Sequence, residues 1–342
     1  MSLSIGHPLR RVVGPAALAL AAACTSNETR VATRDSSIDA EARDSSGAWR
    51  VGAVDGFRQP ESVKYDSAED VFYVSNMYGE GSTKDGVGYI ARFNAADLGD
   101  LRIVVESGRN GATLDAPKGL ALHGDTLWTA DIDVLRAFDK HTGAPLATID
   151  LRPSHAVLLN DVDVGPDGSL HVTDSGIIMS DKGVLYPRGD KIFVIGPGRS
   201  VSIVAQGDSL HLPNGITWDG TRKRWIVVSF DPFHSEVYVP HGDSARTVLG
   251  SGKGRFDGVE VLADGTILVT CWTDSSVHAF HDGRDTRIIR NLPMPADLGL
   301  DTRRNRVAVP LVNRSRVEIW SLPRQAGNTR VVARGDTLLP VH

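Results

Sequence analysis

Four residues with side-chain oxygens open four similar stretches of this chain. Glu61 stands in PESV, Asn160 in LNDVDVGPDG, Asn214 in LPNGITWD and Asp257 in FDGVEVLADGTILVTCW. In each stretch the oxygen donor precedes a short apolar run with the composition of a β-strand. A carboxylate at the start of a strand that becomes buried costs free energy unless a positive group meets it. The pattern therefore predicts that Asp257 and its counterparts meet a cation.

These stretches belong to a repeat that covers most of the chain. Six segments share an opening residue, an apolar strand, a turn of the Asp-Gly type and a second apolar strand. The opening residues are Glu61, Lys118, Asn160, Asn214, Asp257 and Ala296, separated by 57, 42, 54, 43 and 39 positions. Such spacings suit units of four strands and roughly 40–50 residues, with loop insertions in the longer ones.

The repeat predicts an all-β fold for residues 49–342, a six-bladed β-propeller with four-stranded antiparallel blades. A closed ring of blades removes the unpaired sheet edges that an open array would expose. The stretch WRVGAVDGF, which precedes the first repeat, is expected to complete the last blade as a closing strand.

The first strand of each propeller blade lines the central channel, so the opening residues are expected to converge on one axis. Glu61, Asn160, Asn214 and Asp257 then form a set of oxygen donors that suits Ca²⁺ and leaves positions for water or substrate. Each residue taken alone is also typical of a turn or a strand cap, as Asn214 before Gly215 illustrates. The same position in four of six repeats favours the metal site.

The four motifs, in this order and spacing, resemble the calcium-dependent propellers of the regucalcin (senescence marker protein)–gluconolactonase family. That family is similar in turn to the paraoxonases and diisopropylfluorophosphatase. The resemblance implies a catalytic Ca²⁺, or another divalent cation, held by Glu61, Asn160, Asn214 and Asp257. It also implies that Asp257 acts in the chemistry, either as a general base on water or as a nucleophile.

Two opening positions depart from the oxygen pattern. Lys118 would bring an ammonium to the channel, where it orients an anionic substrate, pairs with Glu61 or weakens Ca²⁺ binding. The alternative is that its head group lies in solvent at the rim. Ala296 offers no ligand, and Asp297 after it is expected to be a further ligand, an acid behind the ligands or a turn former.

Three more residues of the third repeat are candidates for a supporting role. Asp161 and Asp174 are expected to support the ligands from behind. His155 is expected either to shuttle protons at the rim or to be an ordinary solvated loop residue. The long loops of the first and third repeats are expected to determine the choice of substrate.

The N-terminus is typical of an export signal. Residues 1–23 combine a basic start, containing Arg10 and Arg11, with the short apolar run VVGPAALALAAA, and Cys24 follows. This pattern predicts a lipoprotein signal peptide with lipid on Cys24, ordinary cleavage nearby being the alternative. Residues 24–48 are polar and charged, which is typical of a disordered tether. We therefore expect a periplasmic protein that reaches the membrane only through its lipid anchor.

The predicted function is calcium-dependent hydrolysis of a small-molecule lactone or related ester, with the metal polarising the carbonyl and stabilising the oxyanion. The alternative is a non-catalytic ligand-binding propeller in which the metal is structural. The net charge of −5 and the lack of a basic cluster argue against nucleic acid as a partner. We expect a monomer.

Overall fold

The structure is a computed structural model that describes residues 47–180, 182–187, 189–242 and 245–323. All of these residues belong to one compact unit. The predicted signal peptide, Cys24 and nearly all of the predicted tether lie outside the described residues. None of the described segments forms a helix that is long and apolar enough to span a membrane.

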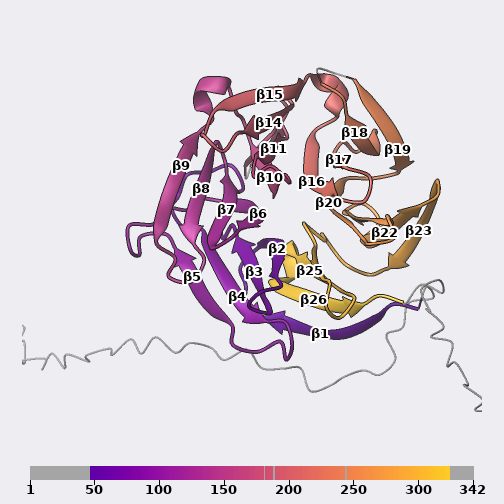
Figure 1. Cartoon of the computed structure of the whole chain (residues 1–342), viewed down its shortest axis with the longest axis horizontal. Helices are drawn as coiled ribbons and strands as arrows, with labels where there is room; N and C mark the ends of the chain where they lie inside the picture. Colours follow the sequence, from indigo (N-terminus) through magenta and orange to yellow (C-terminus); the bar gives the residue numbers. More distant parts are fainter. Residues whose placement is uncertain (1–46, 181, 188, 243–244, 324–342) are drawn as a thin grey trace, which may run out of the picture. The chain divides into compact units, whose positions relative to one another are not determined.

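The described residues form six four-stranded antiparallel sheets arranged as the blades of a ring, which confirms the predicted fold (Figure 1). Two further strands, β12 (Ile178–Ser180) and β13 (Gly183–Leu185), pair as a separate hairpin. From the first strand outward, the first blade contains β2 (Pro60–Asp66), β3 (Val71–Asn76), β4 (Tyr89–Asn94) and β5 (Arg102–Glu106), and the second contains β6 (Pro117–His123), β7 (Thr126–Asp131), β8 (Val134–Asp139) and β9 (Pro145–Asp150). The third contains β10 (Leu159–Val164), β11 (Leu170–Asp174), β14 (Lys191–Ile195) and β15 (Val201–Gln206), and the fourth contains β16 (Pro213–Asp219), β17 (Arg224–Ser229), β18 (Ser235–Pro240) and β19 (Arg246–Gly252). The fifth contains β20 (Phe256–Val261), β21 (Ile267–Cys271), β22 (Ser276–His281) and β23 (Arg284–Ile289), and the sixth contains β24 (Gly299–Asp301), β25 (Arg306–Leu311), β26 (Arg316–Ser321) and β1 (Trp49–Asp55).

The ring is closed by its N-terminal strand, as the sequence predicts. Strand β1 pairs antiparallel with β26 and becomes the outer strand of the sixth blade. At the end of this pairing Arg316 donates to both carboxylate oxygens of Asp55, at 2.8 and 2.9 Å. Such a bidentate pair fixes the register of the two strands as well as adding binding energy.

The first strands form the innermost ring, where neighbouring blades approach closely (Figure 1). Strand β6 contacts β2 and β10, and β16 contacts β10 and β20. Gly119 permits one of these approaches, because a Cβ added there would lie 2.5 Å from the Cα of Asp161. Gly258 permits another, with an added Cβ at 2.5 Å from the Cα of Asp297.

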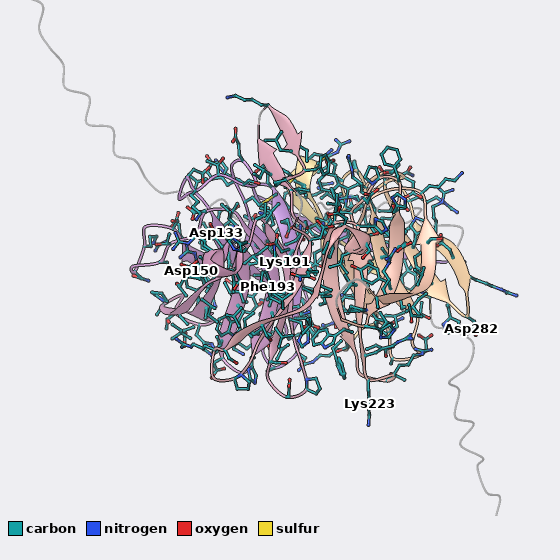
Figure 2. All side chains as sticks on the ribbon, turned by 90° about the horizontal axis from the view of Figure 1, so that it is seen from above. Asp133, Asp150, Lys191, Phe193, Lys223 and Asp282 are labelled. Atoms are coloured by element: carbon teal, nitrogen blue, oxygen red, sulfur yellow. The ribbon has the colours of Figure 1, made fainter. Side chains whose placement is uncertain are left out.

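Apolar side chains fill the spaces between adjacent blades. Phe193, for example, packs in a cluster with Leu135 of the second blade and Val172 of the third. Figure 2 shows Phe193 inside the molecule, whereas Lys223 projects from the β16–β17 turn on one face and the β12–β13 hairpin projects on the opposite face. The two faces of the ring are therefore built from different loops.

Candidate active site

Strand pairing shows that the six predicted opening residues occupy equivalent places. In every blade, the residue before the opening residue pairs with the last residue of the second strand. These pairs are Pro60–Asn76, Pro117–Asp131, Leu159–Asp174, Pro213–Ser229, Phe256–Cys271 and Pro295–Leu311. Glu61, Lys118, Asn160, Asn214, Asp257 and Ala296 consequently form one layer of the channel, which we call the opening layer.

A register shift accompanies the opening layer in five blades. It lies between residues 60 and 63 in the first blade and recurs at 117/120, 159/162, 213/216 and 256/259. Bulges of this kind re-aim side chains next to functional sites. Here each shift spans an opening residue and the residue after it, so the backbone departs from regular pleating where the oxygen donors stand.

The opening layer holds buried oxygen atoms that have no hydrogen-bond partner. Glu61, Asn160, Asn214 and Asp257 are only 3–6 % exposed. Within the described part of the chain, nine buried side-chain nitrogen or oxygen atoms lack a partner, and they include Oε2 of Glu61, Oδ1 of Asn214 and Oδ1 of Asp257. Buried polar atoms are nearly always satisfied, so three such acceptors in one layer match a cation site.

The charges of the opening layer are close enough to interact. Burial raises the pKa of Glu61 well above its ordinary value, and the neighbouring carboxyl of Asp257 raises it further. Burial also raises the pKa of Asp257, with Asp297 adding to the effect. Both carboxyl groups therefore disfavour ionisation in the protein alone, and a divalent cation between them would reverse that preference.

Lys118 faces the channel rather than solvent. Its side chain is fully buried, at 1 % exposure, and its Nζ donates to the carbonyl oxygens of Gly81 at 2.6 Å and Ala116 at 3.1 Å. Burial lowers its pKa, which the charge of Glu61 opposes. The solvated-rim interpretation is therefore wrong, and Lys118 ties the loop after β3 to the opening layer.

Asp161 and Asp297 each come directly after an opening residue in the sequence, and each makes a hydrogen bond to a neighbouring blade. Oδ1 and Oδ2 of Asp161 accept the backbone N–H groups of Val162 and Ile216, each at 2.7 Å. Oδ2 of Asp297 accepts the hydroxyl of Ser62 at 2.6 Å. Burial raises the pKa of Asp297 to about 7. These contacts place both aspartates behind the oxygen donors, where they hold adjacent first strands together.

Asp174 and His155 lie outside the opening layer. Asp174 ends β11 and accepts the N–H groups of Val157 and Leu158 at 2.9 and 2.8 Å, so it fixes the loop that leads to Asn160. His155 follows a short 3-10 helix, η1 (Arg152–Ser154), and is exposed. The structure thus gives Asp174 a supporting role through the backbone and favours the solvated interpretation of His155.

Trp272 is a neighbour of Asp257 that sequence reasoning missed. Its indole N–H lowers the pKa of Asp257. The two groups fall short of hydrogen-bond geometry, because the indole nitrogen and Oδ1 of Asp257 both remain without a partner. Trp272 directly follows the second strand, the position that Met77 and Phe230 hold in their blades. Aligning that column of large apolar residues would have singled it out.

A second polar layer lies three residues further along the first strands. Nζ of Lys64 is 3.3 Å from Oε1 of Glu260 and 3.5 Å from Oδ1 of Asp163, and the hydroxyl of Thr217 is 3.4 Å from both carboxylates. These residues come from four different blades, so they meet at the channel axis. Lys64, Asp163, Thr217 and Glu260 are called the second layer below.

A family comparison agrees with this arrangement. The model of the SMP-30/Gluconolactonase/LRE-like region matches residues 60–299, which is more than half of the chain. The chain belongs to this family. The matched range begins with the first strand of the first blade and ends at the first residue of β24, so it contains all six opening positions. A search of the curated proteins finds no match.

Solved structures with the same fold carry several activities. A gluconolactonase from Xanthomonas campestris is 16 % identical, with a TM-score of 0.62 over 86 % of this chain and 97 % of that one. A luciferin-regenerating enzyme is 11 % identical, with a TM-score of 0.56 over 78 % of this chain and 91 % of that one. An aldose sugar dehydrogenase from Streptomyces coelicolor with bound PQQ is 13 % identical, with a TM-score of 0.58 over 80 % of this chain and 97 % of that one. At these identities the likeness shows the fold alone, and the site must be argued from its residues.

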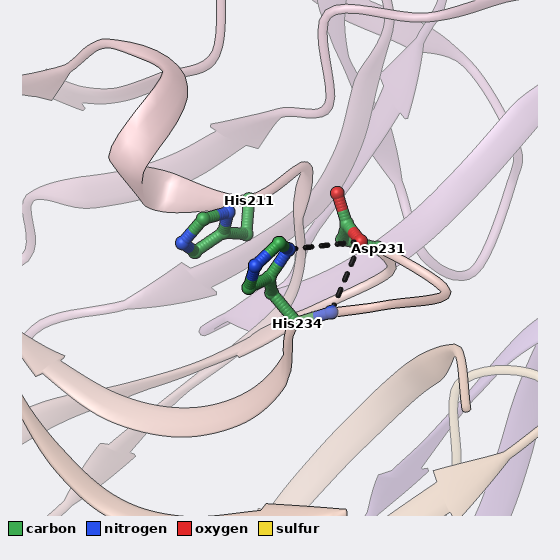
Figure 3. A group of neighbouring side chains, drawn as sticks. All are labelled: His211, Asp231 and His234. Carbon is green, nitrogen blue, oxygen red and sulfur yellow. Dashed lines mark hydrogen bonds and ion pairs between the residues drawn. The ribbon is translucent and has the colours of Figure 1, made fainter. Parts of the chain in front are cut away.

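Two histidine clusters of this SMP-30/gluconolactonase/LRE-like chain lie away from the opening layer. His211, Asp231 and His234 are neighbours, but the two imidazole rings are stacked, 4.4 Å apart and inclined by only 11° (Figure 3). One ligand atom of each of the three residues lies within 4.8 Å of the others. In the second cluster, the two ring nitrogens of His278 form hydrogen bonds with Asp274 at 3.0 Å and with Asp285 at 2.8 Å. Neither cluster shares a residue with the oxygen set of the channel.

Proposed function

We propose that this chain is a calcium-dependent hydrolase of lactones or related esters. The observation that carries the proposal is the set of buried oxygens of Glu61, Asn214 and Asp257 that have no partner within the protein. The layer contains two carboxylates and two amides and no thiolate or imidazole, which suits Ca²⁺ better than a transition metal. Membership of a family that is named for a gluconolactonase favours lactones among possible substrates.

Glu61, Asn160, Asn214 and Asp257 are the residues that would hold the ion. When bound, Ca²⁺ supplies Lewis acidity for the carbonyl and charge stabilisation for the oxyanion. Asp257 keeps an acceptor oxygen that no protein group uses, which suits either a general base that takes a proton from water or a nucleophile. Trp272 flanks this carboxyl.

The alternative use of Lys118 as an anion receptor has less support. Its ammonium already donates to two carbonyl oxygens, those of Gly81 and Ala116, and its charge interacts with Glu61. An anionic ligand would have to displace these partners. Within the proposed function, Lys118 positions the loop after β3 and moderates the negative charge of the opening layer.

The test combines metal analysis with a panel of lactones and aryl esters. Purified protein is expected to contain about one Ca²⁺ per chain, to lose hydrolytic activity on chelation and to regain it when Ca²⁺ is added back. Stoichiometric Ca²⁺ with no hydrolysis of any panel member would overturn the enzyme and leave a structural metal. Full activity after complete removal of divalent cations would overturn the role of the metal.

We also propose that the protein is exported, carries lipid on Cys24 and acts as a periplasmic monomer. The basic start, the short apolar run and the cysteine that follows it support this placement. Cys24→Ala is expected to move the protein from the membrane fraction to the soluble periplasmic fraction, with unchanged mass on size exclusion. Retention of the variant in the membrane fraction would contradict the lipid anchor.

A further inference from the structure

A ring of apolar side chains lies directly beyond the opening layer, and its members come from all six blades. Apart from Ala296, which is itself an opening residue, they stand either two residues before an opening residue or within a few residues after the end of a second strand. They are in mutual contact and are Met77, Ala116, Ile132, Leu158, Ile177, Met179, Leu212, Phe230, Trp272, Met294, Ala296 and Val312. We call this set the mouth ring.

The backbone repeats one contact that places the mouth ring. In several blades the residue after the second strand donates its N–H to the carbonyl two residues before the opening residue. The pairs include Met77–Gln59, Phe230–Leu212, Trp272–Arg255 and Val312–Met294, at 2.9–3.2 Å. Two side chains from each such blade are therefore held at the level just beyond the oxygen donors, on the side from which a substrate reaches them.

The ring borders accessible space, in contrast to the cores between blades. Met77, Leu212, Phe230 and Val312 are 8–9 % exposed, and Trp272, Met179 and Met294 are exposed further. Apolar residues of the same blades that pack between sheets, such as Val74, are fully buried. The apolar face of the ring is thus reachable by a ligand that enters towards Asp257.

Several polar groups at ring level already have partners, whereas the indole N–H of Trp272 has none among the described residues. Oε1 of Gln59 accepts the N–H of Gly79 at 3.0 Å, and the hydroxyl of Ser175 donates to the carbonyl of Pro213 at 2.8 Å. The guanidinium of Arg255 lies over the Phe230 ring, 5.5 Å from its centroid. The indole N–H can serve one hydroxyl of a polyhydroxylated ligand, and the remaining hydroxyls would lie against carbon, which costs free energy for each unpaired hydroxyl.

Apolar residues continue outward from the ring along the loops. Tyr78 follows Met77, Ile178 follows Ile177, and Leu185 lies on the β12–β13 hairpin, with exposures of 44, 38 and 64 %. Within the ring, Phe230 and Trp272 meet edge to face at 5.1 Å, and three methionines supply an adaptable surface. The apolar path thus extends from the reactive carboxyl to the loop tips.

We infer that the substrates are lactones or esters that carry a hydrocarbon chain or ring, and that the site discriminates against sugar lactones. This inference rests on the proposed hydrolase and specifies its substrate class. The carbonyl end of the substrate meets the opening layer, and the hydrocarbon part lies against the mouth ring. Each methylene that leaves water on this surface contributes about 0.8 kcal/mol, equivalent to about a fourfold gain in kcat/KM.

The experiment compares δ-lactones that differ only in the length of an alkyl substituent with gluconolactone, which has the same ring size. We expect kcat/KM to rise about fourfold per methylene and to exceed the gluconolactone value by at least about 100-fold for a four-carbon substituent. Met294→Gln, which keeps the length of the side chain, is expected to flatten the dependence of kcat/KM on the length of the alkyl substituent.

The matched control is Ile103→Gln on the outer strand β5, where the side chain is 45 % exposed and far from the ring. It is expected to leave the chain-length dependence intact. Faster turnover of gluconolactone than of every alkyl lactone, abolished by Asp257→Asn, would overturn the inference and leave the hydrolase standing. Hydrolysis of neither class would overturn the hydrolase itself and, with it, the substrate class.

Discussion

The opening layer and the second layer are two polar layers of one channel, and they solve the same electrostatic problem in different ways. Both bring carboxyl groups from different blades to the axis, fully buried in the opening layer and partly buried in the second layer. The second layer supplies its own cation, since Lys64 pairs with Asp163 and Glu260. The opening layer leaves oxygens of Glu61, Asn214 and Asp257 without a partner. The opening layer also contains a cation, Lys118, but its ammonium is held by two carbonyl oxygens and leaves those three oxygens unpaired. The comparison therefore supports the proposal that the opening layer is the one that binds a ligand.

The largest expected effect is a loss of activity in an opening-layer variant that a second-layer variant does not show. Asp257→Asn is expected to lower kcat for the best panel lactone by about 100- to 10,000-fold, because it removes the base or nucleophile. Glu260→Gln, which neutralises a partly buried carboxyl in the second layer, is the matched control and is expected to keep kcat within a few-fold. Equal losses in the two variants would break the comparison.

A substitution in the second layer is expected to affect stability, whereas the largest effect on activity is expected from the opening layer. Lys64→Met leaves Asp163 and Glu260 without their cation at a partly buried site, so the free energy of unfolding is expected to fall by about 1–3 kcal/mol in urea denaturation. Lys223→Met, on an exposed turn, serves as the control and is expected to change stability by less than about 0.5 kcal/mol. A Lys64 variant as stable as the control would show that the second layer does not need its internal cation.

Calcium is expected to stabilise the protein through the opening layer alone. At a free Ca²⁺ concentration 100 times the dissociation constant, the free energy of unfolding should rise by about 2.7 kcal/mol. Glu61→Gln is expected to abolish most of this increase, and Glu260→Gln is expected to retain it. Thermal denaturation with and without chelator measures the difference, and an increase that survives Glu61→Gln would place the ion elsewhere.

The smallest expected effect is on stability and concerns the polar cluster of His278, Asp274 and Asp285. This cluster resembles the second layer because its charged groups are paired with each other. Burial opposes the charge of His278, but Asp285, with Cys271 and Asp274, raises the pKa of its imidazole to about 10. Since the folded pKa is raised, this stabilisation is complete below about pH 6.5 and declines as pH rises towards 10.

His278→Gln is expected to reduce the stability at pH 6 by about 2 kcal/mol, with a smaller reduction at pH 10. Unfolding curves at the two pH values provide the measurement. The same loss at both values would mean that His278 contributes by packing and not as a cation. Activity is expected to be unaffected, because the cluster is separate from the opening layer.

The repeat was sufficient to predict the blades and their closure. The six opening positions and the strand that closes the sixth blade follow from patterns of apolar residues and turns, which depend on local chemistry. The second layer could have been found in the same alignment, three positions after each opening residue. It was missed because Lys64, Asp163 and Glu260 each look like ordinary surface charges in a strand.

The sequence by itself determined the fold class, the order of the blades and the column of oxygen donors, because strand periodicity and turn residues are encoded locally. The tertiary structure decided which polar residues are satisfied. It buried Lys118 against two carbonyls, joined Asp161 and Asp297 to neighbouring blades and left His155 in solvent. Those outcomes depend on how closely six blades approach one axis, and that distance is set by packing across the whole ring.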